Sequence, residues 1–336
     1  MKNLFEGHDF KEDLTLDDKT LFLEESLRLF RLQAVQNPIY SDYIRLLSID
    51  VSKITSLEQI PFLPVGFFKI HELKCGNFTA EAIFESSGTT SSVNSKHFVK
   101  DIASYLQNAT SIFNQFYGPI SDYCILALLP SYLERNNSSL VCMVDHFIKQ
   151  SGHKQSGFFL NDHDNLYSTL SKLEDENQPT VLFGVTFALL DFSEKYKMNL
   201  KNTIVLETGG MKGRRKEITR EELHLFLNKQ LGVNAVHAEY GMTELLSQAY
   251  SFGNGLFKMP SNMKVLLRSL DDPFDIWTSD NDRQQTGVIN IIDLANKDSI
   301  CFIATEDLGR FTADGGFEIV GRLDNSDIRG CSLLVV

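Results

Sequence analysis

The pattern of hydrophobic and polar positions changes along the chain. Within residues 15–36, apolar side chains from Leu23 to Ala34 recur at helical spacing and form one stripe, which predicts an amphipathic helix. The Asn37-Pro38 pair that follows predicts the end of this helix, because the residue before a proline disfavours helical backbone angles.

The middle of the chain alternates short β-prone runs with helical runs. The runs DYCILALLP, PTVLFGV, NTIVLETGG and NAVHAEYG predict strands. Between the last two, a helix is predicted by a capping box of Thr219 and Glu222 and by a terminal Gly232. This order predicts an α/β fold with a mainly parallel sheet and flanking helices, in which ligands bind beyond the carboxyl ends of the strands.

From about residue 262 the pattern becomes a series of short strands. The runs are KVLLRSL, GVINIIDL, ICFIATEDLG, GRFTAD and GFEIVGRLD, and an Asp314-Gly315-Gly316 turn predicts a hairpin before the last of them. This part of the chain therefore predicts a small antiparallel β unit.

Composition excludes several classes of protein. The hydrophobic fraction of 43% and the charged fraction of 23% are ordinary for a soluble globular domain. A net charge of −12 argues against nonspecific binding to nucleic acid or to an anionic membrane. No apolar run approaches the roughly 20 residues of a membrane-spanning helix, so no integral membrane segment is expected.

The N-terminal residues and the cysteines indicate a cytoplasmic protein. The first residues are polar and acidic, unlike a secretory signal. The cysteines are odd in number, widely spaced and without a C-x-x-C pair, which argues against a disulfide framework or a zinc site and suits a reducing compartment. They are Cys75, Cys124, Cys142, Cys301 and Cys331.

A loop rich in serine, threonine and glycine is the first candidate for binding phosphate. Hydroxyl groups and backbone N–H groups are phosphate donors, and glycine lets the backbone approach closely. A polar surface turn is the alternative, and no G-x-x-x-x-G-K P-loop is present. The candidate residues are Ser86, Ser87, Gly88, Thr89 and Thr90, with Lys96 after them.

A second candidate is the segment Tyr240-Gly241-Met242-Thr243-Glu244, which follows a predicted strand. A hydroxyl beside a carboxylate can hold a triphosphate and its Mg2+, which prefers carboxylate and phosphate oxygens. The alternative is a helix N-terminus that Thr243 caps.

Two further candidates lie in the predicted β unit. Asp307 follows the strand ICFIA and can accept hydrogen bonds from ribose hydroxyls, or it belongs to a turn that ends the strand. Arg322 follows the hairpin and can reach ribose or phosphate oxygens, or it is a solvated partner in a salt bridge.

These motifs occur in the order SSGTT, YGMTE, TEDLGR and GRLD, and in this order they resemble the adenylate-forming superfamily of acyl-CoA synthetases, luciferases and adenylation domains. From about residue 30 to the end, the chain looks like the bacterial acyl-protein synthetases of the luminescence fatty acid reductase complex. Segments that carry this resemblance include IPFLPVGFFK, ETGGMKGRR and IRGCSLLV. The phenylacetate-CoA ligases are a related group.

The resemblance implies a domain organisation. Residues 1–321 are expected to form the large domain, with the β unit at about 262–321, and residues 322–336 to form a hinge-like stub. The small domain that follows in the wider superfamily is expected to be absent, and with it a catalytic lysine. Lys212 in the basic segment KGRR is a candidate replacement, and a solvated loop is the alternative.

The resemblance also implies roles for the candidate residues. ATP and a carboxylic acid, such as a fatty acid, would give an acyl-adenylate and pyrophosphate. Tyr240 and Gly241 would belong to the nucleotide site, and Gly209 and Gly210 would let the adenine lie flat against the backbone. The loop around Gly88 would hold phosphates, as would Thr243; Glu244 would bind Mg2+; Asp307 and Arg322 would bind on the ribose side.

A second step needs a nucleophile, and Cys331 lies where the acyl-protein synthetases carry their acylated cysteine. Arg329 nearby would favour its thiolate. The final acceptor would be a reductase subunit, CoA or a carrier protein. Two other functions stay open: an acyltransferase that uses acyl-CoA or acyl-carrier protein without adenylation, and a non-catalytic subunit that binds nucleotide or acyl groups.

Overall fold

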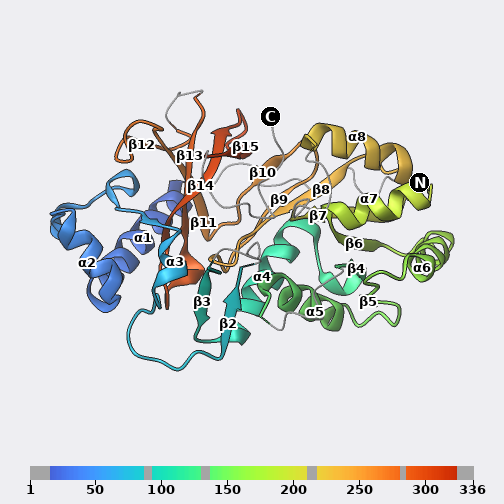
Figure 1. The fold of residues 1–336 in the computed structure, drawn as a ribbon, viewed down its shortest axis with the longest axis horizontal. Coiled ribbons are helices and arrows are strands. Elements are labelled where there is room, and N and C mark those ends of the chain that lie inside the picture. Colours follow the sequence, from blue (N-terminus) through green and yellow to red (C-terminus); the bar gives the residue numbers. More distant parts are fainter. Residues whose placement is uncertain (1–15, 87–92, 130–136, 210–217, 281–284, 324–336) are drawn as a thin grey trace.

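The computed structural model describes the chain apart from residues 1–15, 87–92, 130–136, 210–217, 281–284 and 324–336 (Figure 1). It opens with helices α1 (Leu16–Gln36) and α2 (Pro38–Leu46), followed by strand β1 (Leu63–Pro64) and helix α3 (Phe67–Ile70). The helix predicted over residues 15–36 is confirmed. Asn37 separates the two helices, and its side chain caps α2 by accepting a hydrogen bond from the backbone N–H of Tyr40 at 3.1 Å.

One half of the main sheet is parallel, in the order β5-β4-β6-β7-β8. Figure 1 shows α7 and α8 on one side of these strands and α4 and α5 on the other. The strands are β4 (Cys124–Leu128), β5 (Gly157–Phe158), β6 (Thr180–Val185), β7 (Thr203–Thr208) and β8 (Val236–Tyr240). The helices are α4 (Ile102–Tyr117), α5 (Ser139–Ser151), α6 (His163–Asp175), α7 (Thr186–Lys195) and α8 (Arg220–Leu231).

The parallel strands form as their sequences predict. Every residue of β4, β6 and β7 is buried, as expected where helices cover both faces of a sheet. In α8 the predicted capping box is present: Glu222 N–H donates to the Thr219 hydroxyl, and Thr219 N–H donates to the Glu222 carboxylate. Gly232 ends the helix with a left-handed φ of 69°.

The other half of the sheet is antiparallel and continues from β8 in the order β9-β10-β15-β14-β13-β11-β12. Its strands are β9 (Ala249–Ser251), β10 (Leu256–Lys258), β11 (Met263–Arg268), β12 (Ile276–Trp277), β13 (Gly287–Asp293), β14 (Phe302–Phe311) and β15 (Phe317–Arg322). The predicted α/β class, with a mainly parallel sheet and an antiparallel β unit, is confirmed. Because β15 pairs with β10 and β9 pairs with β8, the β unit continues the main sheet.

A separate two-stranded sheet consists of β2 (Ala82–Glu85) and β3 (Lys96–Val99), which form the arms of a hairpin. The residues that connect these arms include the predicted phosphate loop. Within the described part of the chain, no helix is long and apolar enough to cross a membrane.

The structure excludes two alternatives that the sequence left open, a turn at Asp307 and a helix capped by Thr243. Strand β14 does not end before the TEDLGR motif but runs through it, with a bulge between Leu308 and Gly309, so Asp307 lies inside a strand. Residues 241–248 contain no helix, so Thr243 caps none. This segment is held instead by side-chain contacts: the backbone N–H groups of Leu246 and Ser247 both donate to Asp293, at 2.8 and 3.0 Å.

The buried apolar side chains form two cores. The parallel core lies around β4, β6 and β7 and includes Phe147 and Phe183. The antiparallel core joins α1 and α2 to the other half of the sheet, where Tyr40 stacks on Phe302 at 6.3 Å. Strand β8 lies at the junction, because Val236 belongs to the first core and Tyr240 to the second.

Candidate nucleotide site

Tyr240, the last residue of β8, connects the two halves of the sheet. Its hydroxyl donates to a carboxylate oxygen of Asp307 in β14 at 2.9 Å, and both side chains are buried. The ring packs edge-on against Phe257 and Phe317 at 6.0 and 5.7 Å, which fixes the direction of the hydroxyl. The contact between Tyr240 and Asp307 therefore joins the YGMTE motif to the TEDLGR motif.

Arg322 lies directly opposite Asp307 in the β14–β15 pair. Its Nη2 is 2.6 Å from the Glu306 carboxylate, and its Nε is 3.9 Å from Asp307 Oδ1. The Arg322 side chain is only 7% exposed, so the solvated salt bridge considered for it is wrong. Among the described residues its Nε and Nη1 have no hydrogen-bond partner, which leaves donors for an oxygen-rich ligand.

The base of the β2–β3 loop is closed by Ser86. Its backbone N–H donates to the carbonyl of Ser95 at 3.1 Å, and its hydroxyl accepts from Ser95 N–H at 2.9 Å. Lys96, the next residue, is exposed and lies 4.0 Å from the carboxylate of Glu85. Ser86 therefore sets where the predicted phosphate loop begins and ends.

His97 in β3 connects this hairpin to the YGMTE segment. The ring is buried, and its Nδ1 lies 2.8 Å from the backbone carbonyl of Thr243. Because burial lowers the pKa of His97, the ring is neutral at pH 7 and carries its proton on Nδ1 to make this bond. The ring of Phe68 in α3 meets it edge-on at 5.6 Å.

The Glu244 position is fixed from the antiparallel half. The amide of Asn296 donates to the backbone carbonyl of Glu244 at 2.8 Å, and the side chain of Glu244 is buried. Asp293 holds the two residues beyond it, Leu246 and Ser247, and also accepts from the Ser247 hydroxyl at 2.7 Å. The Thr243-Glu244 turn is thus held by β3, by β13 and by the turn that follows β13.

The Gly209 turn follows β7 at the edge of the parallel half. Gly209 has a left-handed φ of 76°, and its carbonyl accepts from the Thr186 hydroxyl at 3.3 Å. Thr208, just before it, donates to the carboxyl group of Glu239 in β8, and Thr186 donates to that of Glu207. Burial raises the pKa of Glu239 to about 7 and also raises the pKa of Glu207.

Contacts in the described residues therefore bring four predicted regions together. The segment from Glu239 to Glu244 contacts the Gly209 turn through Thr208, the hairpin through His97, and β14 through Asp307. Within the segment, Gly241 comes directly after the residue that contacts Asp307. Ser87, Gly88, Thr89, Thr90, Gly210, Lys212 and Cys331 lie outside the described residues, so their roles stay predictions.

Several residues of this arrangement were not singled out from the sequence. Glu239 directly precedes the YGMTE motif, but nothing in the sequence indicates which residue it contacts. His97 has the sequence context of an ordinary strand residue, and no spacing connects Asp293 with Ser247. Only the folded arrangement brings these pairs together.

The described residues suit a nucleotide and its metal ion. They contain no group of three or more His, Cys, Asp or Glu side chains that could hold a metal by itself. Thr243 and Glu244 offer a hydroxyl and a carboxylate, which fit a Mg2+ whose other ligands are phosphate oxygens and waters. The unpartnered nitrogens of Arg322 fit the oxygens of the nucleotide.

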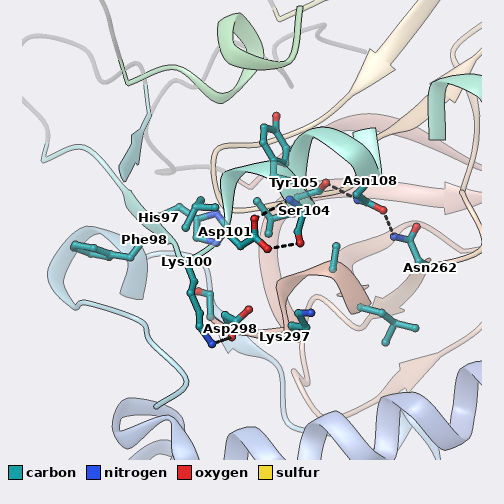
Figure 2. Close-up of a pocket in the computed structure, with 15 residues that line it drawn as sticks. His97, Phe98, Lys100, Asp101, Ser104, Tyr105, Asn108, Asn262, Lys297 and Asp298 are labelled. Atoms are coloured by element: carbon teal, nitrogen blue, oxygen red, sulfur yellow. Dashed lines mark hydrogen bonds and ion pairs between the residues drawn. The ribbon is translucent and has the colours of Figure 1, made fainter. Parts of the chain in front are cut away.

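A pocket of about 260 Å³ lies next to this arrangement (Figure 2). It is lined by β3, by the first turns of α4 and by the turn after β13. Its polar groups pair with one another: Lys100 with Asp298 at 3.1 Å, and the amide of Asn262 with Asn108 at 2.8 Å (Figure 2). None of the site residues predicted from the sequence lines this pocket, but His97 borders both the pocket and the candidate nucleotide site.

No protein-family model and no curated protein matches the sequence. Solved structures match the fold. A 2-hydroxyisobutyryl-CoA ligase in complex with 2-HIB-AMP and CoA aligns with a TM-score of 0.66 at 11% identity, over 94% of this chain and 70% of the ligase. ATP-bound MatB from Rhodopseudomonas palustris aligns with a TM-score of 0.53 at 14% identity, over 72% and 48%. The O-succinylbenzoate coenzyme A synthetase of Bacillus subtilis, with ATP and magnesium, aligns with a TM-score of 0.50 at 15% identity, over 90% and 62%.

These similarities show that the chain shares the fold of the matched part of these ligases. The chain spans about half the length of MatB. At identities of 11–15%, the similarity extends to the fold and not to the reaction of any one ligase.

Proposed function

We propose that the protein activates a carboxylic acid with ATP, forming an acyl-adenylate and pyrophosphate. One observation carries this proposal: the segment from Glu239 to Glu244 contacts Thr208 beside the Gly209 turn, His97 in the β2–β3 hairpin, and Asp307 in β14. The ligands named in the matching structures, ATP and an acyl-AMP, are the substrate and the intermediate of this reaction.

In the proposed step, a carboxylate oxygen attacks the α-phosphorus of ATP. The new C–O–P bond forms as the bond from the α-phosphorus to the bridging oxygen breaks, and pyrophosphate leaves with the electron pair. The protein accelerates such a step by positioning the reactants and stabilising charge. Asp307 would accept hydrogen bonds from the ribose hydroxyls while Tyr240 keeps its carboxylate in place, and Arg322 would donate from its unpartnered nitrogens.

The phosphates would lie between the β2–β3 loop and Thr243, whose main chain His97 holds. Glu244 would hold Mg2+, which neutralises phosphate charge when bound. Lys212 would supply a cation that neutralises charge during adenylation.

We further propose that the acid is a fatty acid and that the protein works in the cytoplasm as an acyl-protein synthetase. The thiol sulfur of Cys331 would attack the acyl carbon of the adenylate, AMP would leave, and the thiol proton would pass to solvent. The resulting thioester would then transfer its acyl group to a reductase subunit, CoA or a carrier protein. This finer proposal rests on the sequence resemblance and on the position of Cys331.

ATP–pyrophosphate exchange, measured with magnesium and a panel of carboxylic acids, tests the first step. We expect exchange that needs both magnesium and an acid, and that is strongest with medium or long fatty acids. Exchange that depends on neither magnesium nor an acid would contradict adenylation and favour the acyltransferase alternative. Glu244→Gln should raise the magnesium concentration needed for half-maximal exchange.

Intact-protein mass spectrometry after incubation with ATP, magnesium and fatty acid tests the second step. The wild type should gain the mass of one acyl group, and hydroxylamine should remove it as expected of a thioester. Cys331→Ala should lose this label and keep pyrophosphate exchange. A variant that still labels as wild type would exclude Cys331 as the acyl carrier and leave the first step standing.

A further inference from the structure

Glu239 is a buried acid that the proposed reaction does not yet use. Its side chain is 9% exposed, and one carboxyl oxygen accepts from the Thr208 hydroxyl, next to the Gly209 turn. Glu239 therefore lies between two turns that, in the proposed function, surround the nucleotide.

Gly241 explains where Oε1 points. A Cβ atom at residue 241 would lie 2.2 Å from Glu239 Oε1, a distance that no real contact allows. The backbone of Gly241 is not in the left-handed region, so its conformation alone does not demand glycine. Glycine is required here because the carboxyl group of Glu239 occupies the space of a side chain.

Aromatic residues and one other acid surround Glu239. Tyr250 lies opposite it in β9, Tyr105 and Tyr117 face it from α4, and Glu207 adds a second acid from β7. None of these groups is positively charged, so nothing among them offsets the cost of an ionised Glu239. Burial raises the pKa of Glu239 to about 7, and the neighbouring Glu207 adds to this rise.

We propose that Glu239 is a positioning residue that joins the Gly209 turn to the Gly241 turn, and that its carboxyl group carries a proton when nucleotide is bound. The proposal rests on the proposed function, because it assumes that nucleotide binds at these turns. The neutral carboxyl group fits under Gly241 and accepts from Thr208. An ionised one would place a buried negative charge beside a negatively charged nucleotide, which like-charge repulsion opposes.

Nucleotide binding and protonation of Glu239 are coupled in this proposal. Added negative charge favours the protonated acid, so nucleotide binding takes up a proton at pH values above the pKa of the free protein. Affinity for ATP should therefore fall as pH rises from 6 to 8. The fall should be about five- to tenfold, since each pH unit above that pKa changes the affinity by up to about tenfold.

Equilibrium binding of ATP with magnesium at pH 6, 7 and 8 tests the proposal in the wild type and in Glu239→Gln. Glutamine keeps an acceptor for Thr208 but cannot ionise, so the wild-type to variant affinity ratio should change with pH. The titration of ATP itself cancels in this ratio. Glu207→Gln is the matched comparison: it removes the neighbouring acid that raises the pKa of Glu239, so it should keep the fall in affinity but move that fall to lower pH.

The outcomes separate the two proposals. A wild type that binds no ATP at any pH contradicts the proposed function. A wild type that binds ATP, with a ratio to Glu239→Gln that stays constant from pH 6 to 8, overturns the role of Glu239 alone.

The contact with Gly241 gives an independent test. Gly241→Ala should weaken ATP binding about tenfold or more, because the new methyl group meets Glu239 Oε1. Adding Glu239→Ala removes this oxygen, so the double variant should bind ATP more tightly than Gly241→Ala alone. If the double variant binds ATP more weakly than Gly241→Ala, the Glu239–Gly241 contact does not position the turn and the proposal fails.

Discussion

The two halves of the sheet contribute different chemistry to the candidate site. The parallel half supplies backbone turns, at Gly209 and Gly241, that rest on hydroxyl and carboxyl side chains in buried strands. The antiparallel half supplies charged side chains, Asp307 and Arg322, that face each other across one strand pair. Both contact the end of β8, where Glu239 binds Thr208 and Tyr240 binds Asp307.

This difference follows from how the strands run. Parallel strands end at one edge of a sheet, so their last residues and the turns after them gather there. Antiparallel neighbours place directly opposed side chains close together, which suits a charged pair that must be held in register. The parallel half therefore controls how close the backbone comes to a ligand, and the antiparallel half controls charge.

The largest expected effect is on the charged pair of the antiparallel half. Arg322→Ala should lower the free energy of unfolding by about 3 kcal/mol, because it leaves the buried Asp307 carboxylate without its cation. Urea denaturation measures this loss. The matched control is Arg310→Ala in the same hairpin, whose pair with Glu318 is more exposed and should contribute less than about 1 kcal/mol. Equal losses of unfolding free energy in the two variants would show that the buried pair of Arg322 contributes no more than the exposed pair of Arg310.

The next effect belongs to the parallel half and depends on pH. Glu239 has a pKa of about 7 in the folded protein against 4.5 for an ordinary glutamate, so its contribution to stability is present at low pH and is lost as pH rises towards 7. Between pH 5 and pH 8, the stability of Glu239→Gln relative to wild type should therefore rise by roughly 2–3 kcal/mol. Thermal or urea unfolding across this range measures the change.

An acid in the antiparallel half provides the control for that measurement. Hydrogen bonds from Lys258 and Thr312 lower the pKa of Asp314 to about 2. Its contribution is present above its ordinary value of 3.8 and is lost only as pH falls through 2, so Asp314→Asn should differ from wild type by a constant amount between pH 5 and 8. If the stability of Asp314→Asn relative to wild type rises with pH as much as that of Glu239→Gln, the effect is not specific to Glu239.

A third prediction concerns the ligand. Asp307→Ala should weaken ATP binding by about 1.5–3 kcal/mol, or roughly tenfold to a hundredfold, because it removes a charged hydrogen-bond acceptor. Calorimetry measures the affinity. Tyr240→Phe is the comparison: it keeps the carboxylate but removes the hydroxyl that holds it, and should cost less. An Asp307→Ala variant that binds as wild type would remove the antiparallel half from the nucleotide site.

Much of the fold was predictable because local signals were strong. Fully apolar runs identified β4, β6 and β7, and the capping box with Gly232 identified both ends of α8. The errors came where distant contacts decide the local structure. A helix after Glu244 was plausible from the sequence, but Asp293 binds the backbone N–H groups of residues 246 and 247 in another conformation.

The candidate site divides in the same way. Motif order in the sequence pointed to Asp307, Arg322 and the segment from Tyr240 to Glu244. The supporting contacts join residues that are far apart in the sequence: His97 and Thr243 are separated by 146 positions, and Asp293 and Ser247 by 46. No periodicity in the sequence predicts such pairs. Burial of Arg322 was also missed, because an arginine after a hairpin is usually solvated, whereas here it pairs with Glu306 and Asp307 of β14.

The smallest predicted effect tests the link between the two turns of the parallel half. Thr208→Val removes the hydroxyl that donates to Glu239 and should cost about 1 kcal/mol of stability. This hydrogen bond lowers the pKa of Glu239, so its loss should move the pH range in which stability falls to higher pH. Thr186→Val, which removes the donor to Glu207, is the matched control and should cost a similar amount without moving that range. Unfolding of both variants between pH 5 and 9 measures the midpoint. A midpoint shared by Thr208→Val and the wild type would show that Thr208 does not tune Glu239, and would leave burial alone to set the pKa of that acid.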